Sequence, residues 1–282
     1  MSHTSTLKRF NPDNSSSSTH RIRDVFPPGL DSSSSKSIPG RSHYTLAPDQ
    51  LYRTLTSYEP GKHVESILVK SAWYGKQSRL AKQEFIVIHV EDIAIKGLTN
   101  YIALDRSTSA PSSIFSNLIP HSRLRFHGEM ARDAFRVAYD GDEEQLLHEC
   151  NLDPHECLEQ LEFHADEPLL LYQLSTLVYL ISERYPEYGV ADLNGCWFAR
   201  LIWECMRQVR PRAKLTHDGQ SARKRGKLGW VRPVPDSAEI TTICQAFNQT
   251  TQILESELSE SKNVSANNVP LDWELTDLVP IF

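Results

Sequence analysis

The order of two apolar periods along the chain limits its possible folds more than any other feature of the sequence. Within residues 84–93, apolar side chains alternate between two faces, which is the pattern of a β-strand. Extended segments of the same kind are predicted at 64–74, 101–105 and 134–139. From Asp166 onward, apolar residues recur every three or four positions, which is the period of an α-helix. Strands followed by helices predict an α+β fold in which helices pack on an antiparallel sheet.

About three major helices are expected on that sheet. They are predicted to start near Asp166, Gly195 and Asp236, and Asn194 is the expected N-cap of the middle one. A helix start places unpaired backbone N–H groups beside the cap, so the residues that follow Asn194 have special electrostatic surroundings.

Two short helices are predicted between the strands and the major helices. The first covers 142–150 and begins with three acidic residues. The second covers 153–161, where Asp153 is the expected cap and Pro154 occupies the first helical position. Both segments have apolar residues at helical spacing, which predicts that each buries one face.

A serine-rich composition distinguishes the start of the chain. Runs of serine occur at 15–18 and 32–35, and apolar residues are sparse there. Such a segment cannot bury enough surface to offset its ordering entropy, so residues 1–43 are predicted to form a disordered arm. A single α+β domain is expected over 44–262, followed by a C-terminal tail at 263–282.

Charge and cysteine content indicate the compartment. The formal net charge of −6 argues against a whole-protein footprint for nucleic acid. The five cysteines are an odd number and no apolar leader opens the sequence, so a reducing cytoplasmic or nuclear location is expected. The most apolar stretch, 169–181, falls short of the roughly 20 residues that a bilayer span needs, so no membrane contact is expected.

Cys196 is the best candidate for a reactive residue. It lies in the first turn of the helix predicted to start at Gly195, where unpaired N–H groups favour a thiolate. A cysteine nucleophile needs a base within hydrogen-bond reach, and His89, in the middle of a predicted strand, is the preferred partner. His164 and His63 are the alternatives. Packing in the core is the competing interpretation, because free cysteine is among the most buried residue types.

The sequence Asn-Gly-Cys-Trp-Phe at 194–198 resembles the Asn-Cys-x-His-Phe helix start of lecithin retinol acyltransferase-like proteins. These proteins are circularly permuted papain-like enzymes in which a strand histidine precedes the helix-start cysteine. The resemblance implies a thiol hydrolase or acyltransferase with Cys196 as nucleophile and His89 as base. The chain departs from the motif because Gly195 intervenes and Phe198 stands where the motif has histidine.

A longer stretch of the chain, roughly 64–260, is similar to an uncharacterised family of basidiomycete fungal proteins. The residues that carry this resemblance lie at 84–87, 100–106 and 196–199. The similarity supports the predicted domain limits and implies no particular chemistry.

A repeated His-Glu-Cys triplet occupies 148–150 and 155–157. Two histidines and two cysteines are the ligand types of a zinc tetrahedron. Residues two apart on a helix point to nearly opposite sides, however, so each histidine is expected to face away from its cysteine. We therefore predict no metal site. The sequence also lacks a phosphate-binding glycine loop, a Gly-x-Ser-x-Gly elbow and a kinase signature, so no cofactor is expected.

A basic segment at 207–232 contains a single acidic residue and three glycines, which predicts a flexible loop. Its densest part offers a weak anion or nucleic-acid contact, or a nuclear import signal, through Arg223, Lys224, Arg225 and Lys227. A solvated loop that balances the acidic domain is the preferred interpretation, because aromatic residues for stacking bases are absent except Trp230.

Two functions are consistent with the sequence. The preferred one is a non-enzymatic intracellular protein that binds a protein partner through its arm and basic segment, since no complete catalytic set is evident. The alternative is the papain-like thiol hydrolase or acyltransferase. The surroundings of Cys196 distinguish the two, because the enzyme needs an accessible sulfur beside a histidine nitrogen.

Overall fold

The structure is a computed structural model that describes residues 22–28, 30, 43–57, 64–78, 83–108, 129–189, 194–217, 219–220, 222–226 and 234–267. Within these ranges, the fold combines five helices with one antiparallel sheet, which confirms the predicted α+β class. The helices are α1 (Pro48–Thr56), α2 (Glu143–Glu149), α3 (Leu171–Arg184), α4 (Gly195–Val209) and α5 (Ser237–Asn267). None of them has the length and apolarity that a membrane-spanning segment needs.

The sheet follows the strand order β1-β5-β4-β3-β2-β6-β9. Its strands are β1 (Tyr44–Leu46), β2 (Ile67–Gln77), β3 (Glu84–Asp92), β4 (Leu98–Thr108), β5 (Glu129–Val137), β6 (His155–Glu162) and β9 (Lys214–His217). Two short strands also join it, with β7 (Leu169–Leu170) beside β2 and β8 (Glu187–Tyr188) beside β5. The four strands β2 to β5 form an antiparallel meander, and the chain then returns so that β6 pairs with the free edge of β2.

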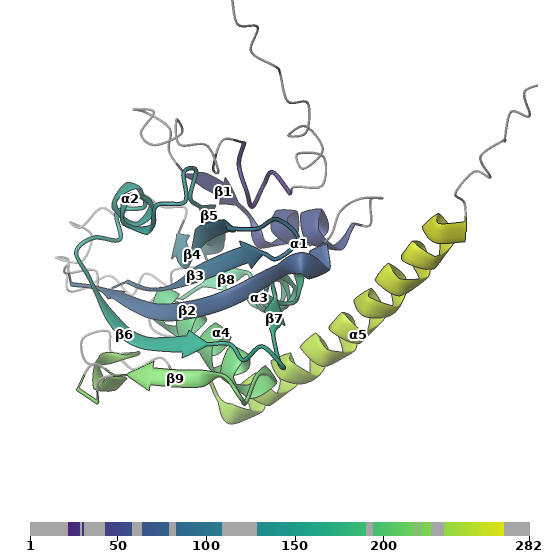
Figure 1. Cartoon of the computed structure of the whole chain (residues 1–282). Coiled ribbons are helices and arrows are strands. Elements are labelled where there is room, and N and C mark those ends of the chain that lie inside the picture. The colour runs from purple at the N-terminus through teal and green to yellow at the C-terminus, as the bar shows by residue number, and fades with distance from the viewer. Residues whose placement is uncertain are drawn as a thin grey trace, which may run out of the picture.

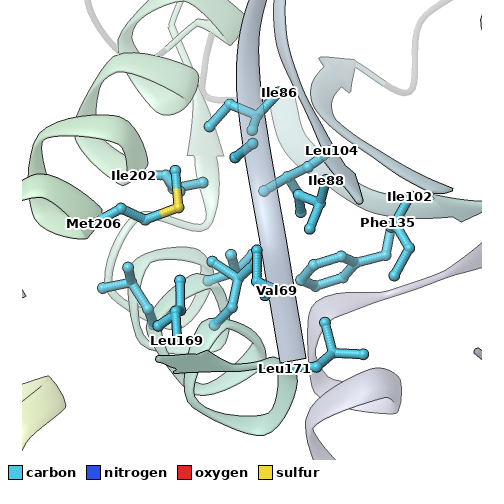
Figure 2. Close-up of a cluster of buried hydrophobic side chains, with 14 of the residues drawn as sticks. Val69, Ile86, Ile88, Ile102, Leu104, Phe135, Leu169, Leu171, Ile202 and Met206 are labelled. Carbon is cyan, nitrogen blue, oxygen red and sulfur yellow. The ribbon is translucent and has the colours of Figure 1, made fainter. Parts of the chain in front are cut away.

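The helices are divided unequally between the two faces of the sheet (Figure 1). Helices α3 and α4 pack on one face, α5 packs on both of them, and α2 lies on the opposite face. The alternation of side chains along β3 explains this layering. Ile86 and Ile88 point into the main core together with Ile202 and Met206 of α4 (Figure 2), whereas Phe85 belongs to a smaller cluster under α2.

Several local predictions are confirmed. Helix α4 begins at Gly195, and the Asn194 side chain caps it as expected by accepting hydrogen bonds from the backbone N–H groups of the second and third helical residues. The first predicted short helix, which begins with three acidic residues, is present as α2 and is capped by Asp142. Strands β3 and β4 form a hairpin, and Gly97 in its connection has a positive φ of 77°. These signals are local, so the tertiary structure did not override them.

The second predicted short helix is wrong, because 155–162 form strand β6. The edge of β2 from Ser71 to Gln77 pairs with β6 in antiparallel register. Leu158 and Leu161 thereby enter the main core. Backbone pairing with an open strand edge and burial of these two side chains outweigh an apolar spacing that also suits a helix.

Part of the predicted arm belongs to the folded unit. In the described stretch 22–28, the side chains of Val25 and Phe26 are fully buried in the main core. The buried Asn100 amide donates to the Val25 carbonyl at 2.6 Å and to the Ala138 carbonyl at 2.9 Å, which ties the segment to β4 and to the end of β5. Residues 1–21, 29 and 31–42 lie outside the described residues. The folded unit therefore takes in residues on the arm side of the boundary predicted at Tyr44.

The predicted basic flexible loop is also partly ordered. Within 207–232, α4 continues to Val209, β9 forms an edge strand, and Ala222–Lys224 form a 3-10 turn called η3. The part 227–232 lies outside the described residues. At the C-terminal end, α5 runs to Asn267 and so passes the predicted start of the tail, of which 268–282 are likewise outside the described ranges.

We expect Phe26→Ala to lower the free energy of unfolding by about 3–5 kcal/mol, because it leaves a cavity in the main core. Urea unfolding followed by tryptophan fluorescence measures the change. Arg23→Ala is the matched control, since Arg23 lies in the same segment with an exposed side chain. Equal stability of the two variants would show that the segment does not contribute to the core.

Candidate functional site

Cys196 lies where α4 meets the sheet. Its backbone N–H donates to the Asn194 side-chain oxygen at 2.9 Å, and that of Trp197 donates to the same oxygen at 3.1 Å. The N–H groups that were expected to favour a thiolate are therefore already satisfied by the cap. The Cys196 residue is only 3 % exposed.

The electrostatic surroundings of Cys196 favour the thiol. Burial, and next the charge of Glu84, raise the pKa of Cys196 to about 12, although Lys76 and a backbone hydrogen bond with Glu84 oppose this shift. At neutral pH the sulfur is therefore protonated. A buried, protonated thiol is not a nucleophile, because the thiolate is the reactive form.

His89 lies on the other side of the sheet. Its ring stacks on Tyr101 with centroids 4.7 Å apart. Residues 86 and 88 of β3 face α4, so the alternation of the strand turns His89 to the α2 face. The structure thus does not bring the predicted nucleophile and base together. His164 lies in the turn after β6 and faces Asp166 at 3.4 Å, and His63 is outside the described residues.

A buried ionic cluster surrounds Cys196 instead of a catalytic pair. The Glu84 carboxylate, fully buried, accepts hydrogen bonds from the Tyr74 hydroxyl at 2.5 Å and from Lys76 Nζ at 2.6 Å. The Gly226 N–H donates to both carboxylate oxygens, at 2.9 and 3.0 Å. Each of these partners satisfies part of the hydrogen-bonding capacity of the carboxylate, which makes Glu84 the junction between β2, β3 and the segment after η3.

A second set of polar contacts, partly buried, extends this cluster along α4. Arg225 pairs with Glu159 at 2.9 Å and with Glu204 of α4. The Trp203 indole N–H donates to Glu159 at 2.7 Å. Gly226, the next residue, has φ of 68°, and a Cβ there would come within 2.7 Å of an Arg200 nitrogen. The positive φ favours glycine in the turn that delivers Arg225 and the Gly226 N–H, and a side chain there would also displace the Arg200 guanidinium.

The acidic strand β6 neutralises much of the basic segment. Lys214 pairs with Glu162 at 3.1 Å, and Lys224 pairs with Glu156 at 2.6 Å. Two of the four predicted anion-binding residues, Lys224 and Arg225, are thus engaged by carboxylates of the same chain. Arg223 is exposed, and Lys227 lies outside the described residues. An anion or nucleic-acid contact stays a prediction with fewer available cations than expected.

The repeated His-Glu-Cys triplet is divided between two elements. Residues 148–150 close α2, whereas 155–157 open strand β6. The Nδ1 atom of His155 lies 2.7 Å from the Asp153 carboxylate. The His155 ring also stacks on Trp73. Among the described residues, no group of three or more His, Cys, Asp or Glu side chains is placed to hold a metal ion.

A groove of about 560 Å³ opens on the face where β5 meets α1 and the end of α3. Its size is that of a ligand-binding hollow. Its apolar lining includes the exposed side chain of Met130, and its polar lining includes four hydroxyl groups, two arginines and two acids. The described lining contains neither cysteine nor histidine. It consists of Thr45, Ala47, Pro48, Ser107, Thr108, Met130, Ala131, Arg132, Asp133, Ala134, Arg136, Ser182, Glu183 and Pro186.

The side chain of Asp133 is held rigidly beside this groove. The Arg106 guanidinium donates to both of its carboxylate oxygens, at 2.6 and 2.8 Å, and the Ser182 hydroxyl donates to one of them at 2.6 Å. Arg136 likewise pairs with Asp105 at 2.7 Å. These ion pairs neutralise Asp133 and Arg136, whereas Arg132 and Glu183 of the lining are exposed.

The backbone of β5 explains why the groove lies at this position. The Ala138 N–H donates toward β4, to the Tyr101 carbonyl, whereas the Ala131 N–H donates to the outer edge, to Pro186. Because alternate residues of a strand direct their backbone polar groups to the same edge, those of Asp133 also face outward. Strand β1 pairs with β5 only as far as Phe135, so this part of the edge lies between β1 and β8.

Sequence reasoning missed both the groove and the Glu84 cluster. Glu84 left a usable signal, because it shares the inward face of β3 with Ile86 and Ile88, and a carboxylate on an apolar face requires buried partners. The groove left none, since its lining comes from elements far apart in the sequence.

Comparison of the chain with protein-family models, with curated proteins and with solved structures finds no match. The similarities to basidiomycete proteins and to lecithin retinol acyltransferase-like proteins therefore stay predictions.

We expect iodoacetamide at near-neutral pH to label Cys157 first, because this cysteine is exposed, and to leave Cys196 unmodified in the native protein. Peptide mass spectrometry over a time course measures the two rates, and a denatured sample shows that both cysteines can react. Labelling of native Cys196 as fast as Cys157 would support the thiol-enzyme alternative.

We expect Glu84→Ala to lower the free energy of unfolding by about 3–5 kcal/mol, because it leaves the Lys76 charge buried without its carboxylate. Glu162→Ala is the matched control. It also removes a strand glutamate from a lysine pair, but this pair with Lys214 is exposed, so the expected loss is below about 1 kcal/mol. Urea titration measures both, and similar losses would contradict the role given to the Glu84 cluster.

Proposed function

We propose that this protein is a non-enzymatic interaction protein that binds an extended segment of a protein partner in the groove beside β5. The proposal rests on one observation: the groove beside β5 and the candidate nucleophile Cys196 lie in different parts of the fold. The groove is lined without thiol or imidazole, while Cys196 is buried at the start of α4. A thiol hydrolase or acyltransferase would need these features together.

The chemistry of the groove favours a polypeptide ligand. The outward-facing backbone groups of Asp133 lie between the last β1 pair at Phe135 and the β8 pair at Met130. If the β1 register continued, Pro48 would stand opposite Asp133, and proline has no N–H to offer. An extended chain can supply both a donor and an acceptor to such an edge, and its side chains can contact Met130.

The compartment proposed for this activity is the cytoplasm or the nucleus. All five cysteines are free thiols, which suits a reducing environment. Fluorescence microscopy of the tagged full chain, compared with an Arg223→Glu variant, tests the nuclear part of this proposal, and accumulation in secretory compartments would contradict it.

Met130→Arg is expected to reduce partner recovery at least about tenfold, because it places a charge on the apolar part of the groove. Quantitative mass spectrometry of proteins retained by the tagged full chain measures the change. Ile253→Arg is the control, since Ile253 of α5 is 59 % exposed, close to the 62 % of Met130, and lies away from the groove.

The partner recovered in this way is then purified and added to the full chain. Amide exchange of Asp133 should slow on binding, because its outward-facing N–H is the group that the proposed contact uses, whereas the Ala131 N–H already donates to Pro186. Full retention by Met130→Arg, or protection confined to other segments, would refute the groove as the binding surface.

A further inference from the structure

His43 lies directly before β1, between this strand and the end of α2. Its side chain is only 13 % exposed. The backbone N–H of His43 donates to Glu149 Oε2 of α2 at 2.9 Å. The residues that follow lead into the groove, because Thr45 of β1 and Ala47 belong to its lining. His43 therefore joins α2 to the strand that borders the groove.

A cation that is held in place faces the imidazole ring of His43. Nη1 of Arg136 on β5 lies 3.4 Å from His43 Nε2. A guanidinium can only donate, so Nε2 is the acceptor and the single proton of the neutral ring is on Nδ1. The same guanidinium donates to Asp105 of β4 at 2.7 and 3.3 Å, which restrains it beside the ring. A second proton on His43 would therefore place two positive charges side by side.

The carboxylates near His43 compensate only in part for Arg136. Glu149 Oε2 is 3.8 Å from Nδ1, too far for a hydrogen bond, and among the described residues this buried nitrogen has no hydrogen-bond partner. Asp105 is already paired with Arg136. Burial raises the pKa of Cys150 to about 12, so its thiol adds no charge. Burial, and next Arg136, therefore lower the pKa of His43 although Glu149 and Asp105 act in the opposite direction.

Strand β1 pairs with β5 over a short length. In the antiparallel register Tyr44 lies opposite Val137 and Leu46 lies opposite Phe135. The Ala138 N–H donates toward β4, so the alternation of the strand directs the backbone groups of Phe135 and Val137 to β1. Because the pairing covers only these residues, a small change in electrostatic energy alters the fraction of molecules in which β1 is docked.

We propose that His43 is a proton-sensitive latch that holds β1 on β5 at neutral pH and releases it under mildly acidic conditions. Release extends the open edge of β5 from Asp133 to Phe135 and Val137, and an extended partner segment can use the backbone groups of that edge. This effect on partner binding rests on the function proposed for the groove. The latch itself requires no partner.

The direction of the pH effect follows from the two states of His43. When β1 is released, the ring has its ordinary pKa of 6.5, and when β1 is docked the pKa is lower. The released state then binds more protons, so docking weakens as the pH falls from about 6.5 toward the lower pKa of the docked state. At pH 5.5 the ratio of released to docked molecules rises by up to about tenfold, because protonation of the released ring alone sets this limit.

Hydrogen exchange of the purified full chain at pH 7.5 and 5.5, corrected for the intrinsic exchange rates, measures this ratio. Protection of Tyr44–Leu46 and of 135–137 should fall by about two- to tenfold at pH 5.5, while the pairing of β2 with β3 stays protected. His43→Gln keeps an acceptor for Arg136 but takes up no proton, so its protection should be equal at both pH values. His148→Gln, which changes an exposed histidine of α2, is the matched control and should keep the fall.

His43→Lys places a permanent charge beside Arg136 and should reduce the protection of β1 already at pH 7.5. Unchanged wild-type protection, an equal fall in wild type and His43→Gln, or a loss of protection throughout the sheet would each overturn the latch. The wild-type comparison decides the result even if a variant folds poorly. Because no partner is present in these measurements, a negative result leaves the Met130→Arg test of the groove unaffected.

Discussion

The fully buried carboxylate of Glu84 is the constraint that organises one end of this domain. Removing an ionised carboxylate from water costs several kcal/mol unless charge and hydrogen bonds replace the lost hydration. Lys76, Tyr74 and the Gly226 N–H supply that replacement, and they come from β2 and from the segment after η3. Every element that provides a partner must therefore reach the same position. The start of α4 packs over this position, where a Cβ on Gly195 would approach the Arg106 carbonyl to 3.0 Å.

A second constraint acts on the pairing of β4 with β5. Asp105 and Arg106 are adjacent on β4, and they pair with Arg136 and Asp133 of β5 on opposite faces of the sheet. A slip of one residue would turn each charge to the wrong face and separate it from its partner, so the two ion pairs oppose any other register. The guanidinium of Arg106 also lies 4.5 Å from the centre of the Phe198 ring, which couples the register to the position of α4.

The sequence predicted features that depend on neighbouring residues better than features that depend on long-range contacts. Asn194 identified the start of α4, because a cap and its helix are neighbours in the chain. The β6 segment was predicted as a helix, since its apolar spacing suits both structures and the open edge of β2 is visible only in three dimensions. The same limit applies to the site. Cys196 was placed correctly at a helix start, but the face of the sheet occupied by His89 depends on how the helices divide between the two layers.

The burial of Val25 and Phe26 has a consequence for biosynthesis. Asn100, the hydrogen-bond partner of the Val25 carbonyl, lies 75 residues further along the chain, so the ribosome must make β2, β3 and the start of β4 before this contact can form. During that interval these two apolar side chains lack the core that buries them in the folded domain. An apolar segment that waits for its partners during synthesis is the kind of surface that chaperones bind.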